Sequence, residues 1–182
     1  KFIIFKKQMN RLLFCYLLLL LTVGRAGAQD STARYFHLNN IPATGLTLDK
    51  GWVFHAGDEM AWANPDHPDN DWVTVDPTNE LHHIPIVRKS GIGWFRLKLK
   101  VGSAMQGRTL AFIMSGLGAM EIYLNGHLLF QFGTVSRDFK EEQTQYFNSK
   151  LLSLDLATQS EQVLAIRYSF NKKNLYLKFA NK

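Results

Sequence analysis

Apolar and polar residues alternate along residues 94–100, which read WFRLKLK. Side chains of a β-strand point in turn to its two faces, so this alternation predicts a half-buried strand. Its two faces carry Phe95, Leu97 and Leu99 on one side and Trp94, Arg96, Lys98 and Lys100 on the other.

Similar short apolar segments recur along the chain and are separated by loops rich in Gly, Pro, Asn and Asp. No segment keeps a helical period beyond about one turn, and Asn125-Gly126 is a strong signal for a hairpin turn. Many short strands with such turns predict one all-β domain, an antiparallel sandwich or barrel. The other predicted strands lie at 52–54, 73–77, 109–116, 119–124, 128–132, 150–156, 162–170 and 174–180, and long loops are predicted at 56–72, 81–93 and 133–149.

The N-terminal segment differs from the rest of the chain. Basic residues precede an apolar run from Leu12 to Val23, and Ala26-Gly27-Ala28 follows it. This order is typical of a cleaved secretion signal, and the run is shorter than the roughly 20 residues of a membrane-spanning helix. We therefore expect a signal peptide at 1–28, a polar lead-in at 29–40 and a domain at 41–182 that is truncated at its C-terminal end. The expected location is the periplasmic face of a bacterial membrane, or the exterior as a secreted protein.

Removing residues 1–28 changes the charge balance. The whole chain has 21 Lys+Arg and 15 Asp+Glu. Five of the basic residues and none of the acidic ones lie in the signal, so 16 basic and 15 acidic residues remain, a net charge of +1. Nucleic-acid binding needs a clustered basic face, which this balance does not suggest. Cys15, the only cysteine, leaves with the signal, so we expect no disulfide and no cysteine-based zinc site, and no cofactor is indicated.

Four segments together resemble a known family: WVFHAGDEMAWANPDHPDNDWVTVDP, GIGWFRLKL, MEIYLNGHLLFQFG and QVLAIRYSF. Their order and spacing resemble the galactose-binding-like jelly-roll domains over about residues 36–180. The sugar-binding domain of family-two glycoside hydrolases carries similar segments. The exported N-terminal sensory domains of Bacteroidetes-type membrane signalling proteins, which precede a histidine kinase or phosphatase, are similar in spacing. The resemblance implies an antiparallel jelly-roll β-sandwich.

Three functions are compatible with this resemblance. The first is an exported, non-catalytic sensory module that binds a carbohydrate or another small polar ligand and acts on a membrane segment after residue 182, with a homodimer in the full-length protein. The second is a sugar-binding accessory domain of a secreted glycoside hydrolase. The third is a structural or protein-interaction domain without a small ligand. In each case this segment itself is not an enzyme.

Trp94 and Arg96 are the first candidate ligand-binding residues. A tryptophan at the start of a strand can stack on a sugar ring, and an arginine can bond hydroxyls or a carboxylate. The alternative is a buried tryptophan with an arginine paired to a nearby acid.

The other candidates lie in loops and at the hairpin. Adjacent His82 and His83 would point to opposite faces of a strand, which does not favour a zinc site. Tyr146 lies in the loop at 133–149, and a ligand is expected where this loop meets residues 82–94. Glu121 could form a carboxylate pair with Asp58 or Glu59, although no feature of the sequence brings these together.

Asp66, Asp69 and Asp71 are a weak candidate calcium site. Calcium binds carboxylate oxygens, but the spacing is not that of an EF-hand. Turn formation by the Asp-, Asn- and Pro-rich segment is the alternative.

Overall fold

The computed structural model describes residues 34–138 and 140–170. The signal peptide expected at 1–28 and the strand expected at 174–180 lie outside the described residues and stay predictions. The strands have the bounds β1 Tyr35–Leu38, β2 Trp52–Ala56, β3 Val73–Thr74, β4 Ile92–Val101, β5 Thr109–Leu124, β6 His127–Phe132, β7 Gln145–Asp155 and β8 Glu161–Ser169.

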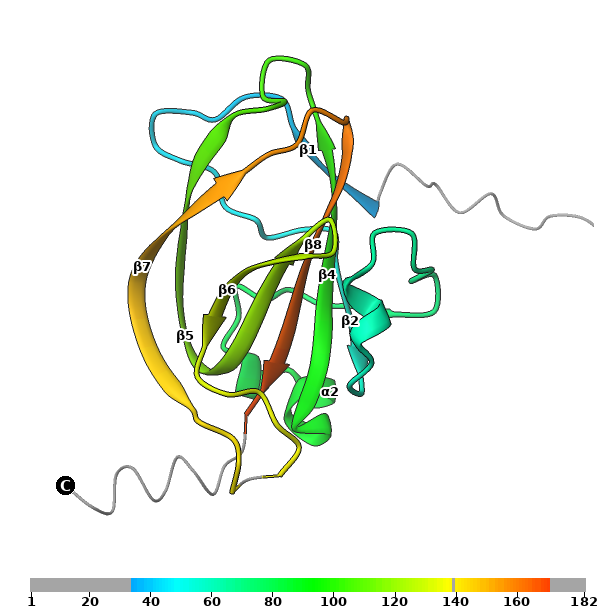
Figure 1. Ribbon diagram of the computed structural model, residues 1–182, viewed down its shortest axis with the longest axis vertical. Coiled ribbons are helices and arrows are strands. Elements are labelled where there is room, and N and C mark those ends of the chain that lie inside the picture. Colours follow the sequence, from blue (N-terminus) through cyan, green and yellow to red (C-terminus); the bar gives the residue numbers. More distant parts are fainter. Residues whose placement is uncertain (1–33, 139, 171–182) are drawn as a thin grey trace, which may run out of the picture. The chain divides into compact units, whose positions relative to one another are not determined.

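The larger layer is a sheet with strand order β3-β2-β4-β8-β5-β6 (Figure 1). Neighbouring strands along this path are antiparallel, and β4 pairs with β8 over Ile92–Lys100 and with β2 over Gly93–Leu97. β1 extends the sheet by pairing in parallel with β4, Tyr35 opposite Lys98 and Leu38 opposite Val101. The polar lead-in predicted at 29–40 is therefore wrong in part, because its end forms a strand.

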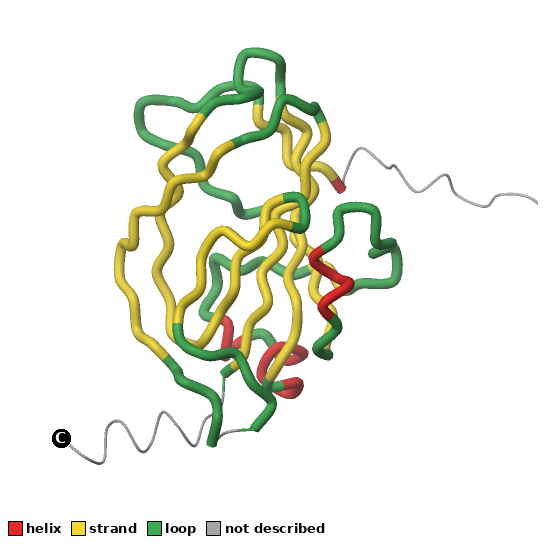
Figure 2. Tube along the Cα trace, in the orientation of Figure 1, coloured by secondary structure: helices red, strands yellow, loops and turns green. Residues whose placement is uncertain are grey.

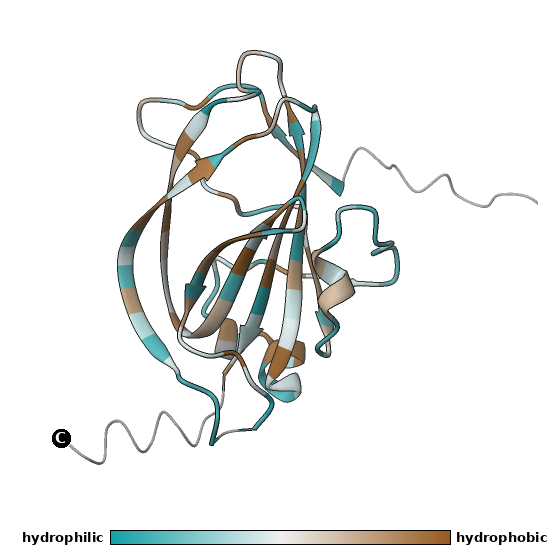
Figure 3. Cartoon of the chain, in the orientation of Figure 1, coloured by the Kyte–Doolittle hydropathy of each residue, from teal (hydrophilic) through white to brown (hydrophobic). Residues whose placement is uncertain are grey.

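The second layer consists of β7 and the first part of β5 (Figure 1). β5 is 16 residues long and belongs to both layers: Thr109–Gly118 pairs with β7, whereas Ala119–Leu124 pairs with β8 and Met120–Leu124 also pairs with β6. The sequence predicted two strands here because glycines interrupt the apolar pattern, and the chain instead shifts register between Met114 and Gly116 without a break. Figure 3 shows alternating hydrophilic and hydrophobic bands along β7, as expected for a strand with one covered face.

The core lies between these layers. It includes side chains of the larger sheet and of β7: Phe54, Phe95, Leu97, Leu99, Ile122, Leu164, Phe147, Leu152 and Leu154. The predicted all-β, antiparallel jelly-roll β-sandwich is confirmed. The inward position of Phe95, Leu97 and Leu99 also confirms the face assigned to them by alternation.

Between Tyr35 and Phe170, the helical elements that the structure describes are short and lie in the connections between strands (Figure 2). They are η2 (Met60–Ala63), η3 (Leu81–His83) and α2 (Pro85–Ser90). Pro85 at the first position of α2 has a pre-set φ, and Gly91 ends the helix in the left-handed conformation at φ 69°. The loop predicted at 81–93 therefore contains two helical turns and the start of β4. No helix in the described part of the chain has the length and apolar character needed to cross a bilayer.

The predicted hairpin turn at Asn125-Gly126 is confirmed. Both residues have positive φ, 51° and 83°, as a type I′ turn requires. The Asn125 carboxamide oxygen also accepts a hydrogen bond from the Val163 backbone N–H at 2.9 Å, which ties the turn to β8.

Candidate functional site

Trp94 lies on the outer face of the larger sheet and is fully buried there. The segment at 57–72 covers this face, so the half-buried strand predicted at 94–100 is covered on both sides over its first half. Trp62 of this segment packs edge-on against Trp94 with ring centroids 6.5 Å apart, and Tyr123 lies 5.4 Å away. The Trp94 ring therefore packs against other aromatic rings and has no exposed surface for a sugar.

Arg96 is also fully buried on this face and organises the covering segment. Its Nε donates to Asp69 Oδ2 at 3.2 Å. Its Nη atoms donate to the backbone carbonyls of Trp62, Asn64, Pro65 and His67. Burial lowers the pKa of Arg96, and the Asp69 carboxylate opposes this effect. The guanidinium thus occupies its donors within the protein, which matches the paired, structural alternative.

The Asp69 carboxylate is shared among cations. Its Oδ1 accepts from Lys98 Nζ at 2.6 Å and lies 3.8 Å from Arg34 Nη1, while Oδ2 binds Arg96. Both oxygens are therefore engaged by cationic side chains, and the calcium hypothesis for Asp66, Asp69 and Asp71 stays a prediction. Asp66 instead donates its backbone N–H to the Asn64 side chain at 2.9 Å, a turn contact. Among residues 34–138 and 140–170, no group of three His, Cys, Asp or Glu side chains is placed to hold a metal ion.

The structure does bring Asp58 and Glu121 together, through Arg167 of β8. Arg167 donates from Nε and Nη2 to Asp58 at 2.6 and 2.8 Å, and from Nη1 to both Glu121 oxygens at 3.1 and 3.2 Å. The hydrogen bonds to Asp58 raise the pKa of Arg167, and burial followed by the bond to Glu121 raises the pKa of Tyr123. One guanidinium therefore bridges the two carboxylates, and its hydrogen bonds engage both oxygens of each.

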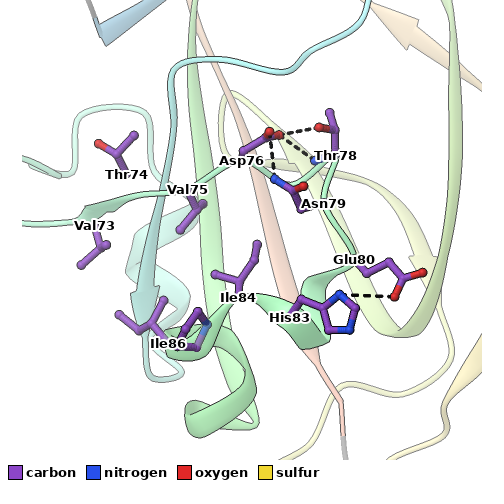
Figure 4. Close-up of a pocket in the computed structure, with 11 residues that line it drawn as sticks. Val73, Thr74, Val75, Asp76, Thr78, Asn79, Glu80, His83, Ile84 and Ile86 are labelled. Atoms are coloured by element: carbon purple, nitrogen blue, oxygen red, sulfur yellow. Dashed lines mark hydrogen bonds and ion pairs between the residues drawn. The ribbon is translucent and has the colours of Figure 1, made fainter.

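An open cleft of about 1040 Å³ lies between β3 and α2 (Figure 4). This β3–α2 cleft combines polar groups with an aliphatic wall. Thr78 donates both its hydroxyl and its backbone N–H to Asp76, at 2.6 and 2.9 Å, and these bonds lower the pKa of the Asp76 carboxyl. The lining residues are Val73, Thr74, Val75, Asp76, Thr78, Asn79, Glu80, His83, Ile84, Pro85 and Ile86.

Of the two candidate histidines, His83 is in this cleft. Its Nδ1 lies 3.6 Å from Glu80 Oε2, and both side chains are largely exposed. The backbone of His82 belongs to the same helical turn, η3. The sequence analysis selected the His82-His83 pair. It did not select Asp76 and Asn79, which line the same cleft as His83, because they belong to no recognised motif. Their position in a turn-rich segment was the only signal that could have indicated them.

Tyr146 lies on β7, opposite Leu117 of β5, and is 74% exposed. The loop predicted at 133–149 is therefore wrong at its end, where β7 begins at Gln145. The remaining loop does meet the start of β4, but at a buried apolar contact of Val135 with Ile92 and Ala119. The structure places Tyr146 beside a separate groove and does not bring it into the β3–α2 cleft.

Tyr168 gives the fold an expected sensitivity to alkaline pH. Burial, with a smaller contribution from Glu142, raises the pKa of its phenol above the ordinary 10.0, and the phenol donates to the Leu117 carbonyl at 2.8 Å. The unfolded chain ionises at this ordinary value and the folded chain does not. This contribution to stability is therefore complete below pH 10 and falls as the pH rises further.

We expect the urea midpoint of unfolding to fall as the pH rises from 9 to 11. Tyr168→Phe should reduce this fall. At pH 8 the variant should lose about 1 kcal/mol of unfolding free energy, because the hydrogen bond to the Leu117 carbonyl is lost. Part of the fall remains in the variant, because the pKa of Tyr123 is also raised. Equal pH dependence in the two proteins would contradict the assignment.

Comparisons with known proteins concern the fold. No family model and no curated protein matches the sequence. A solved structure of Bacteroides uniformis beta-glucuronidase 2, covalently bound to cyclophellitol-6-carboxylate aziridine, matches with a TM-score of 0.51 and 16% identity, over 71% of this chain and 15% of that chain. Ruminococcus gnavus beta-glucuronidase matches with a TM-score of 0.48 and 16% identity, over 68% of this chain and 20% of that chain. The chain thus spans a small part of these enzymes and shares a β-sandwich fold with the first of them.

Proposed function

We propose that this domain is a non-catalytic carbohydrate-binding module of a longer exported protein, and that it binds its ligand in the β3–α2 cleft. The observation that carries the proposal is the composition of that cleft. Carboxylate, amide, hydroxyl and imidazole groups of Asp76, Asn79, Thr78 and His83 surround an aliphatic wall. Ligand sites in general combine an apolar lining with a few polar groups that fix orientation.

The likeness in fold supports an accessory role. The domain shares its architecture with part of Bacteroides uniformis beta-glucuronidase 2, and it covers 15% of that enzyme's chain. A sensory module and a hydrolase accessory domain both need such a binding step, and they differ in the segment that would follow residue 182. We place the hydrolase accessory domain first, because its fold is the one matched.

Isothermal titration of the chain with glucuronic acid, phenyl β-glucuronide, galactose and cello-oligosaccharides tests the proposal. We expect at least one sugar to bind with a Kd of about 1 mM or tighter, equivalent to about −4 kcal/mol. Asn79→Ala and His83→Ala should each weaken binding by about fivefold or more, because each removes a hydrogen-bonding group.

His127→Ala is the matched control. His127 is an exposed histidine on β6 that does not line the cleft, so its removal should leave the affinity unchanged. Binding that persists in both cleft variants would move the site elsewhere. No binding to any of the sugars by a folded sample would contradict the proposal.

A packing role is the second candidate, and the outer face of β5 and β7 favours it. Ile113 and Leu151 are direct cross-strand partners there and are 62% and 66% exposed. An exposed apolar pair of this kind suits contact with a neighbouring domain of the same protein. Two results together would favour this candidate. The chain would bind none of the sugars, and it would capture an adjacent domain of the same protein in a pull-down that Leu151→Lys weakens.

A further inference from the structure

The lining of the β3–α2 cleft is acidic. Asp76 and Glu80 are the charged groups among its 11 residues, so the lining carries a formal charge of −2 while His83 is neutral. Figure 4 shows both carboxylates on the connection between β3 and α2, with Ile84 and Ile86 in the aliphatic wall of the same cleft. A charge of this kind distinguishes between ligands of similar shape and different charge.

Hydrogen bonds hold the Asp76 carboxylate in a fixed orientation. Its Oδ1 accepts from the Thr78 hydroxyl and backbone N–H at 2.6 and 2.9 Å, and its Oδ2 accepts from Asn79 Nδ2 at 3.0 Å. The bonds from Thr78 lower the pKa of the Asp76 carboxyl, so this group is an anion at neutral pH. A carboxylate oxygen can accept more than one hydrogen bond, so Oδ2 can also accept from a ligand.

Glu80 supplies the second carboxylate of the cleft. Its Oε2 lies 3.6 Å from His83 Nδ1, and the side chains of both residues are largely exposed. Asp76 is exposed as well. Because water and salt screen exposed charges, the two carboxylates should change the affinity for a charged ligand only severalfold, and less so at high salt.

Resting on the function proposed above, we propose that the β3–α2 cleft selects amino sugars, whose ring carries an ammonium group, over neutral sugars, and neutral sugars over uronates. An ammonium group donates hydrogen bonds and is attracted by the carboxylates of Asp76 and Glu80. The carboxylate of a uronate accepts hydrogen bonds only and is repelled by the same two groups. A neutral sugar lies between these cases, because its hydroxyls bond to the carboxylates without a net charge.

Isothermal titration with three β-1,4-linked trimers of similar shape tests this order. The trimers are those of glucosamine, of glucose, and of glucose oxidised to the uronate at C6. At neutral pH and low salt, we expect the glucosamine trimer to bind about fivefold more tightly than the glucose trimer, and the uronate trimer about fivefold more weakly. At about 1 M salt, where the screening length falls to about 3 Å, both differences should shrink to about twofold or less.

Two substitutions remove the charges and nearly preserve the shape. Glu80→Gln leaves the Asp76 turn intact and should remove about half of the preference in free energy, so that the glucosamine trimer binds only about twofold more tightly than the glucose trimer. Glu80→Gln combined with Asp76→Asn should bind these two trimers equally. Glu161→Gln is the matched control, because Glu161 is an exposed glutamate that pairs with Lys100 and does not line the cleft. This control should keep the full preference.

The outcomes separate this inference from the proposed function. Equal affinity of the parent chain for the glucosamine and glucose trimers, or tightest binding of the uronate trimer, would overturn the inference and leave the proposed function standing. A full preference that persists in Glu80→Gln would also overturn it, because groups outside the cleft would then select the charge. Binding of none of the three trimers by a folded sample would contradict the proposed function and the inference together.

Discussion

Replacing Arg96 with leucine is expected to destabilise the domain by about 3–5 kcal/mol, the range for removing one partner of a buried ion pair. Leucine fills part of the volume but donates no hydrogen bond. The Asp69 oxygen and the backbone carbonyls of residues 62–67 that Arg96 now satisfies would lose their donor. Guanidinium denaturation, followed by tryptophan fluorescence, measures the loss, because Trp62, Trp72 and Trp94 surround the same site.

The controls for this prediction use the geometry of the guanidinium. Arg96→Lys keeps the charge but has three rotating donors in place of a five-donor fork, so we expect it to recover only part of the stability. Arg108→Leu removes an exposed arginine and should change the free energy of unfolding by about 0.5 kcal/mol or less. An Arg96→Leu protein within 1 kcal/mol of the parent, with an unchanged near-ultraviolet signal, would show that the segment at 57–72 holds itself without Arg96.

Gly93→Ala is expected to cost about 2–3 kcal/mol, at the upper part of the range for overpacking a core. A Cβ at this position would lie 2.7 Å from the His55 carbonyl oxygen and would overlap the Phe54 ring. Both neighbours belong to β2, which pairs with β4 here through Ala56 and Gly93. The two strands would have to move apart, and thermal unfolding would detect this as a lower Tm.

Gly91 is the matched glycine in the same GIG motif. No heavy atom lies within 4 Å of a Cβ built at Gly91, but its φ is +69°. Gly91→Ala should therefore cost only the left-handed backbone penalty, about 1–2 kcal/mol. Gly91→Asn should cost less than Gly91→Ala, because asparagine tolerates this conformation. An equal cost of alanine at Gly91 and Gly93 would show that contact with β2 does not explain the requirement for Gly93.

The fold was predictable from the sequence where the pattern is local. Alternation placed Phe95, Leu97 and Leu99 on the core face, and Asn125-Gly126 marked the hairpin, because both signals depend only on neighbouring residues. β1 was missed because Tyr35–Leu38 is short and follows polar residues, so its pairing with the far end of β4 has no local sign. The continuity of β5 was missed because its glycines resemble a turn.

The site was less predictable because its contacts join distant parts of the chain. Arg96 was recognised as a candidate, but most of its partners are backbone carbonyls of residues 62–67, which every residue type possesses. Glu121 was paired in the prediction with Asp58 or Glu59, and the structure selects Asp58 through Arg167, which no motif had indicated. The β3–α2 cleft depends on how β3 and α2 approach each other, and periodicity carries no information on that distance.

The position of β8 has a consequence for the protein during its synthesis. β8 is the last described strand along the chain, yet it lies in the middle of the larger sheet, between β4 and β5. Until Glu161–Ser169 leaves the ribosome, β4 and β5 each present an unpaired edge with no internal partner. Open edges with apolar faces are prone to association with other chains. Nascent chains that end before residue 161 should therefore depend on chaperones, and those that include β8 should become protease-resistant in one step.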